Sequence, residues 1–186
     1  SLVVAAVRDI SERKQRETMV LAMQKMRQSI WRLDSRSQVQ DILTALQQVL
    51  TDIDVSRMVC GVNIVDESEN EPRATFYNLV DGQAWNTGEI EPEGARVVAE
   101  FHRAGKTVYR PDLFADDSRG ERGRGKTKTR SPRRAIVDVP FSHGTLAFNS
   151  DKAHAFDDHL PVIEEIAEVL SEAFRTPEGW SLGAYW

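Results

Sequence analysis

Apolar positions recur at helical spacing along residues 9–33, a stretch without Gly or Pro. Asp9 and Glu12 fit a capping box at its start, because each side chain can bond a free backbone N–H of the first turn. Further along, apolar residues follow one another in steps of four and three residues, at Met19, Met23, Met26, Ile30 and Leu33. Those steps are typical of the a and d positions of a two-stranded coiled coil. We therefore predict a helix that pairs with its own copy in a parallel homodimer; an amphipathic helix lying on its own domain is the alternative.

A second helix is predicted from residue 37, where Ser37 and Gln40 fit another capping box. Its apolar positions form a wide stripe, which is typical of a helix that packs on its own core. These positions are Val39, Ile42, Leu43, Leu46, Val49, Leu50 and Ile53. The pattern thus suits the first helix to a partner and the second helix to its own domain.

The rest of the chain alternates between strand and helix patterns. Runs rich in β-branched residues and bounded by Gly, Pro or acidic residues predict strands, and segments with apolar residues three and four apart predict helices. The predicted strands are residues 58–65, 73–79, 107–109, 135–141 and 145–148, and the predicted helices are residues 93–103 and 159–174. This order predicts an α+β fold with a mixed or antiparallel sheet and helices on one face.

Composition narrows the class of protein. With 186 residues and 40% hydrophobic content, one core plus an extension is the natural size. No run approaches the roughly 18 apolar residues that a membrane span needs. The single cysteine, Cys60, excludes an internal disulfide and suits a reducing cytoplasm. A net charge of −5 gives no general attraction to nucleic acid. We therefore expect a cytoplasmic protein.

One segment departs from this average. Residues 119–134 hold eight basic side chains against one acid and no apolar residue, so we expect a mobile loop. Such a segment can clamp an anionic ligand, close over a pocket, or dock nucleic acid or an acidic partner. A solvated insertion is favoured, because no aromatic residue lies among the charges to stack on a base. The basic residues singled out are Arg119, Arg122, Arg124, Lys126, Lys128 and Arg130.

Near the start of the chain, the apolar residues 3–7 precede an Asp-Ile-Ser-Glu-Arg-Lys sequence at residues 9–14, and Glu17 follows. This pattern resembles the end of a PAS domain. In that family the last strand runs through a short Asp-Ile-Thr/Ser-Glu-Arg-Lys motif into a signalling helix. The resemblance implies that residues 1–8 end a PAS domain, that residues 9–34 form the signalling helix, and that the chain is a fragment of a longer protein.

A second family pattern lies in five short segments, at residues 104–108, 134–141, 144–148, 155–158 and 165–167. On these segments, residues 35–175 resemble a GAF domain, most closely in their C-terminal half. The resemblance implies a sheet with the first and last helices of the domain on one face and a small-molecule pocket on the other. Residues 176–186 follow as a tail with three aromatic residues, which either packs on a partner subunit or is not native.

Three ligand chemistries of GAF domains are disfavoured. Asn149 and Phe156 match the family's cyclic-nucleotide motif, but Ser150 replaces its Lys, and Leu160 with Pro161 replaces its Asp-Glu pair. Bilin attachment needs a reactive thiol, whereas Cys60 lies on an apolar strand face. The methionine sulfoxide reduction of this family resembles a multi-cysteine chemistry, which one cysteine cannot perform. We expect no cofactor.

Polar residues interrupt otherwise apolar strands at Asn63, Asp138 and Asn149. Strand alternation places these three on the sheet face away from the helices, where the resemblance implies a ligand pocket. A wetted open face is the alternative. None of the four histidines has the spacing of a metal site, and no catalytic constellation is visible. We expect neither a metal site nor enzymatic activity in this chain.

These observations predict a sensory or regulatory module of a multidomain, bacterial-style signal-transduction protein. We expect it to bind an unidentified small molecule, to relay the state of an upstream PAS domain through the dimeric helix, or to do both. The effector, of the kind of a histidine kinase, a cyclase or a DNA-binding region, lies outside this chain. Two alternatives stay open: a ligand-free GAF domain that serves as a dimerisation spacer, and an anion or nucleic-acid binder that acts through the basic segment.

Overall fold

The computed structural model describes residues 2–32, 39–53, 59–80, 84–121 and 133–174. Within these residues the helices are α1 (Leu2–Trp31), α2 (Val39–Asp52), α3 (Pro92–Ala104) and α4 (Leu160–Phe174). The strands are β1 (Val59–Asp66), β2 (Arg73–Val80), β3 (Ala84–Glu89), β4 (Val108–Arg110), β5 (Ala135–Phe141) and β6 (Gly144–Ser150). They form one sheet in the order β3-β2-β1-β6-β5-β4, with every neighbouring pair antiparallel.

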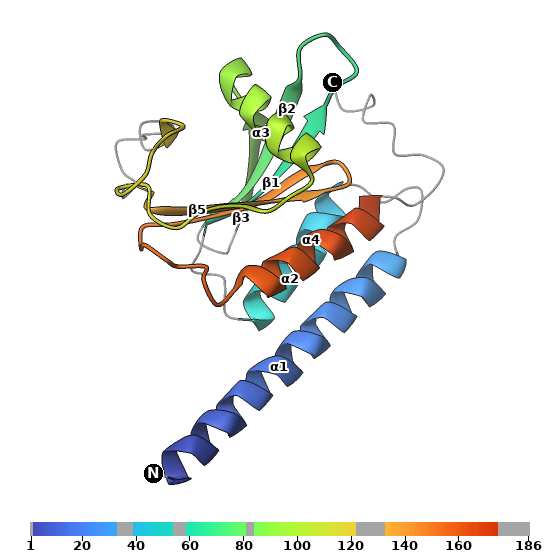
Figure 1. The fold of residues 1–186 in the computed structure, drawn as a ribbon. Coiled ribbons are helices and arrows are strands. Elements are labelled where there is room, and N and C mark those ends of the chain that lie inside the picture. Colours follow the sequence, from blue (N-terminus) through green and yellow to red (C-terminus); the bar gives the residue numbers. More distant parts are fainter. Residues whose placement is uncertain (1, 33–38, 54–58, 81–83, 122–132, 175–186) are drawn as a thin grey trace.

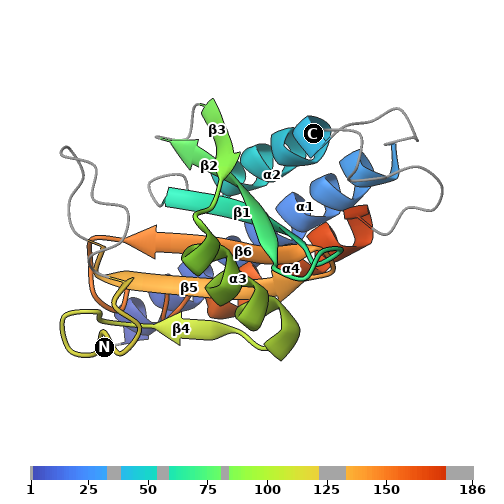
Figure 2. The same cartoon turned by 90° about the horizontal axis from the view of Figure 1, so that it is seen from above.

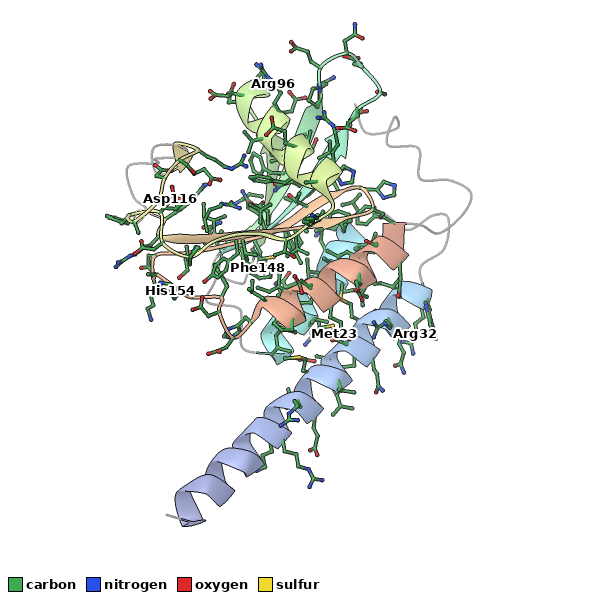
Figure 3. The ribbon with its side chains drawn as sticks, in the orientation of Figure 1. Met23, Arg32, Arg96, Asp116, Phe148 and His154 are labelled. Atoms are coloured by element: carbon green, nitrogen blue, oxygen red, sulfur yellow. The ribbon has the colours of Figure 1, made fainter. Side chains whose placement is uncertain are left out.

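Strand alternation divides the core between the two faces of the sheet. Cys60, Val62 and Ile64 of β1 join one large apolar cluster with α1, α2 and α4. On the other face, Val65 packs in a smaller cluster with two alanines of α3. Figures 1 and 2 show α1, α2 and α4 on one side of the sheet and α3 on the other, and Figure 3 shows Phe148 between the sheet and the helices. The predicted α+β class is confirmed with an antiparallel sheet, but the expectation of helices on one face holds for only three of the four described helices.

The predicted coiled-coil seam of α1 is wrong, because its residues pack inside the chain's own core. Met23, Met26 and Ile30 are only 1%, 1% and 2% exposed, and Met19 is half-buried against the same cluster. Leu33 lies outside the described residues. This apolar stripe of α1 packs in the groove between α2 and α4, so it leaves no surface there for a partner helix. Steps of four and three residues suit a helix on its own domain as well as a coiled coil, so the spacing alone could not decide.

The start of α1 also differs from the prediction. Residues 3–7, expected to be the last strand of a PAS domain, are helical and continuous with the rest of α1. Figure 1 shows this end of α1 extending past the sheet, where no described strand lies beside it to accept its backbone hydrogen bonds. A helix satisfies those groups internally. Asp9 and Glu12, expected to cap the helix, therefore lie inside it.

The remaining elements agree with the sequence patterns, with one omission. All six buried positions of α2 belong to its predicted stripe, and α4 and the other predicted strands lie within a few residues of their expected bounds. Gly105 caps the C-terminus of α3 in a left-handed conformation with a φ of 61°, as predicted from a glycine at this position. The edge strand β3 was missed, because Ala84–Glu89 contains Gly and Asn, and Thr87 is its one β-branched residue. No helix in the described part of the chain is both long enough and apolar enough to cross a membrane.

Candidate functional site

The α3 face of the sheet carries a buried polar cluster at its centre. Asn63, Asp138 and Thr145 are the buried polar residues of the described chain, with 8%, 5% and 0% of their surface exposed. The Asn63 Nδ2 group donates a hydrogen bond of 3.0 Å to Thr145 Oγ1, directly across the β1–β6 pair. Thr145 in turn bonds the Asp138 carboxylate from the neighbouring strand. These residues are hydrogen-bonded to one another, as buried polar groups must be.

The sequence prediction placed Asn63, Asp138 and Asn149 on one face, and strand register does so. The residue that precedes each of them in its strand is apolar and points into the large cluster on the opposite face; these residues are Val62, Val137 and Phe148. Asn63 and Asp138 meet through Thr145, but Asn149 is half-buried beside Ile136 and joins none of the contacts described for that pair. Sequence reasoning missed Thr145, whose position opposite Asn63 becomes apparent only with the register of β1 and β6.

Arg110 at the end of β4 supplies the positive charge of the cluster. Its Nη2 group donates hydrogen bonds to two carboxylates, to Asp138 Oδ2 at 2.5 Å and to Glu121 Oε1 at 3.1 Å. Its Nη1 group donates to the Val108 carbonyl oxygen at 2.7 Å. The Arg110 and Glu121 side chains are each 12% exposed, and that of Asp138 is 8% exposed. One guanidinium therefore lies between two shielded carboxylates. Removing these charges from water costs free energy, and their mutual attraction offsets that cost only while all three groups stay together.

Phe101 of α3 covers this ion cluster from above. Its ring lies 5.1 Å from the Arg110 guanidinium carbon and 4.9 Å from that of Arg119, distances at which cations are attracted to the ring face. Arg119 also lies 3.8 Å from a Glu100 carboxylate oxygen. Of the basic residues singled out in the sequence, Arg119 is thus placed beside the cluster. Arg122, Arg124, Lys126, Lys128 and Arg130 lie outside the described residues.

The segment between β4 and residue 121 is held over the sheet by a second ion pair. Arg134 donates to both carboxylate oxygens of Asp112, at 3.0 and 2.9 Å, and its carbonyl accepts from Leu113 N–H at 2.7 Å. Leu113 is only 1% exposed. Glu121, at the end of this segment, is the acid that the sequence shows inside an otherwise basic run. Its role could not be read from the sequence, because it depends on the return of the chain to Arg110.

Electrostatics single out Asp138 within the cluster. Burial raises the pKa of the Asp138 carboxyl, while the Arg110 charge and hydrogen bond and the Thr145 hydroxyl act in the opposite direction. Cys60, by contrast, lies in the large apolar cluster, where burial raises the pKa of its thiol and suppresses the thiolate. The buried ion pairs described here therefore lie on the α3 face, whereas the single cysteine is held as a neutral thiol in the apolar cluster.

We expect Asp138→Asn to change how stability depends on pH. Because the native pKa of Asp138 lies above the unfolded value of 3.8, the native state binds more protons than the unfolded chain between the two values. The contribution of Asp138 to stability is full below the unfolded pKa and is lost as the pH rises through the native pKa. Urea unfolding over that pH range should show wild type losing more stability than Asp138→Asn.

Asp112→Asn is the matched control for this prediction. The Arg134 hydrogen bonds lower the pKa of Asp112, so its contribution is present above the unfolded pKa and is lost as the pH falls. The two substitutions should therefore change the pH profile in opposite directions. Superimposable profiles for wild type and Asp138→Asn would contradict the raised pKa.

A separate groove lies at the start of α3, between the ends of β2 and β3. Its volume is about 180 Å³, which is below the size of most ligand pockets. Ala74, Ile90 and Ala95 contribute apolar surface, and Arg73, paired with Glu89 at 2.8 Å, lies at its rim. None of the predicted pocket residues Asn63, Asp138 and Asn149 lines this groove. The polar cluster and the groove are therefore two distinct features of the α3 side.

No group of three His, Cys, Asp or Glu side chains in the described part of the chain is arranged to hold a metal ion. No protein-family model matches the chain, and no curated protein matches it either.

Proposed function

We propose that this chain is a GAF-type sensory or regulatory module of a cytoplasmic, multidomain signal-transduction protein. Its role is to relay a conformational state between the α3 face of the sheet and helix α1, toward an effector elsewhere in the full-length protein. An adjoining PAS domain supplies one input, and an unidentified small molecule at the α3 face supplies another. The chain itself regulates and does not catalyse.

One observation carries this proposal: the C-terminal half of α1 is part of the same core as the sheet. Met23, Met26 and Ile30 pack in the cluster that holds the inward side chains of β1, β5 and β6. Any shift of these strands changes the packing of α1, because closely packed interiors transmit small displacements. A helix that extends past the domain, as Figure 1 shows, can pass such a shift to what lies beyond.

The contacts form a continuous route from the polar cluster to α1. Asp138 lies on β5, and Phe141 at the end of the same strand packs on Phe174 of α4 with ring centroids 5.4 Å apart. The neighbouring Ser142 N–H donates to Ser171 Oγ of α4 at 3.0 Å. In α4, Glu165 accepts from Arg27 of α1 at 3.4 Å. These contacts make β5 and α4 the proposed relay between the polar cluster and α1.

Hydrogen exchange of the full chain tests the relay. We expect Asp138→Asn to raise exchange in α4 and in residues 19–31 of α1 by roughly tenfold, which corresponds to about 1.4 kcal/mol of opening free energy. Strands β2 and β3, outside the route, should change less. The control is Glu89→Gln, which makes the same acid-to-amide change in the exposed Arg73–Glu89 pair. An even loss of protection across the sheet would indicate general destabilisation and contradict the relay.

A second candidate, a ligand-free GAF domain that spaces and joins other domains, is favoured by one feature. The charges of the polar cluster are paired with one another, since Arg110 contacts both Glu121 and Asp138. A cluster that is complete without a ligand needs none for stability. Thermal melting of the chain with a collection of small anions and metabolites separates the two candidates. A reproducible rise in Tm for any one compound that is abolished by Arg110→Met supports the sensor, and its absence supports the spacer.

A further inference from the structure

Helix α1 exposes large apolar side chains on the side away from its own domain. Four large hydrophobic residues are strongly exposed in the described chain, and three of them lie on α1: Val20 at 55%, Leu21 at 57% and Trp31 at 77%. At 100° per residue they share one side of the helix with the exposed Gln24 and Gln28. We call these five residues the outer stripe. Its members Leu21, Gln24, Gln28 and Trp31 follow in steps of three, four and three, the spacing of a coiled-coil seam.

The domain holds α1 so that the outer stripe cannot turn inward. Met23, Met26 and Ile30 are buried on the opposite side. Two flanking cations are tied to the domain: Lys25 Nζ lies 3.0 Å from Asp52 of α2, and Arg27 lies 3.4 Å from Glu165 of α4. Rotating the helix about its axis would break these contacts and expose the methionines. The outer stripe therefore faces solvent because of how α1 is anchored.

The chemistry of the outer stripe fits a second copy of the same helix. A two-fold contact sets each residue against its own counterpart, so a charged stripe would repel itself. None of the five residues is charged. The amide groups of Gln24 and Gln28 both donate and accept hydrogen bonds, so each can pair with its own copy. The apolar residues at both ends of the stripe supply the surface to be buried.

Access to the stripe is open along the helix. Figures 1 and 2 show α1 as the outermost helix of its layer, with α2 and α4 between it and the sheet. A parallel partner helix would carry its own domain on its far side. Both domains thus lie outside the contact, and Leu21 and Trp31 of one copy meet those of the other.

We propose that the outer stripe of α1 is the surface through which two copies of this chain associate, as a parallel helix pair. The inference rests on the proposed function for the role of α1 as a relay, and it replaces the buried methionine seam as the contact. The inner side of α1 holds the domain, and the outer side holds the partner. The helix is therefore the shared element of a domain core and a dimer interface.

Sedimentation velocity of the full chain over a range of concentrations tests association. We expect Leu21→Glu to raise the dimer dissociation constant at least about tenfold, as for the loss of a buried apolar anchor of an interface. Circular dichroism should stay unchanged, since Leu21 is exposed. The control is Thr18→Glu, at an exposed position of α1 outside the stripe. A wild-type chain that stays monomeric at the highest soluble concentration would overturn the proposal, as would equal effects of the two substitutions.

Disulfide trapping tests the parallel register. Gln28→Cys places thiols opposite each other in the proposed pair, whereas Ser29→Cys, one residue on, points 100° away. The native Cys60 is 1% exposed and does not compete. Under mild oxidation we expect a linked dimer from Gln28→Cys and little from Ser29→Cys. Equal yields from both variants, or none from Gln28→Cys while the protein sediments as a dimer, would overturn the parallel stripe contact.

The two proposals fail separately. A monomeric chain in which Asp138→Asn still loosens residues 19–31 removes the outer-stripe contact and leaves the relay. A trapped Gln28→Cys dimer whose α1 exchange ignores Asp138→Asn keeps the contact and removes the relay.

Discussion

Replacing Met26 with glutamate is expected to unfold the domain. Met26 is 1% exposed and packs between α1 and the core that it shares with α2 and α4. A carboxylate at this position has no described cation to pair with, because Lys25 and Arg27 on either side are bound to Asp52 and Glu165. Burying an unpaired charge is among the few single changes that cost more than about 4 kcal/mol. Urea denaturation followed by circular dichroism should show the loss.

Thr18→Glu is the control for this prediction, because it places the same carboxylate at an exposed position of the same helix, outside both the core and the outer stripe. The unfolding free energy of the domain should then change by less than about 0.5 kcal/mol. If Met26→Glu stays folded and instead only dissociates an oligomer, then Met26 belongs to an intermolecular seam and the packing of α1 described above is wrong.

Replacing Gly144 with alanine is expected to have an effect of similar size. Gly144 opens β6 and pairs with Ile64 of β1, in the middle of the sheet. A Cβ added here would overlap the Asn63 backbone carbonyl oxygen and lie 3.2 Å from Ile64 Cα. Since the obstructing atoms belong to the backbone, no side chain can rotate away, and β1 and β6 must separate. The expected loss is more than about 3 kcal/mol, the upper range for overpacked sites.

Gly105→Ala provides the comparison. It has the left-handed φ of 61° but no atom within 4 Å of an added Cβ. Only the conformational cost of alanine in that region remains, about 1–2 kcal/mol. Thermal unfolding of both variants should show a much lower Tm for Gly144→Ala. A loss at Gly144 no greater than that at Gly105 would mean that the β1–β6 pair accommodates the methyl group.

The parts of the fold that the sequence predicts are those in which a local pattern has one solution. The wide apolar stripe of α2 must be buried on the core of its own domain. Gly105 ends α3 at a position where the backbone is left-handed, a conformation that favours glycine. The placement of α1 has two solutions, because a narrow methionine stripe satisfies either a partner helix or the groove between α2 and α4. Only the assembled helical layer decides between them, and it selects the groove.

The polar cluster shows the same limit. Alternation along single strands places Asn63 and Asp138 on one face, and the structure agrees. The residues that complete the cluster come from other segments: Thr145 through strand register, Arg110 from the short β4, and Glu121 after an excursion of eleven residues. Separations of this kind leave no local period in the sequence, so they become visible only when the tertiary fold brings the segments together.

The strand order also has a consequence for how the chain folds. The central pair of the sheet joins its first strand to its last, and the Asn63–Thr145 hydrogen bond spans 82 residues. Contacts between residues so far apart slow folding, because the connecting chain must lose its freedom before the contact forms. During synthesis, the edge of β1 that pairs with β6 stays unpaired until β6 has left the ribosome. Folding of this domain should therefore be completed late. A chain halted before Gly144 should expose the unpaired edge of β1 and be prone to aggregate.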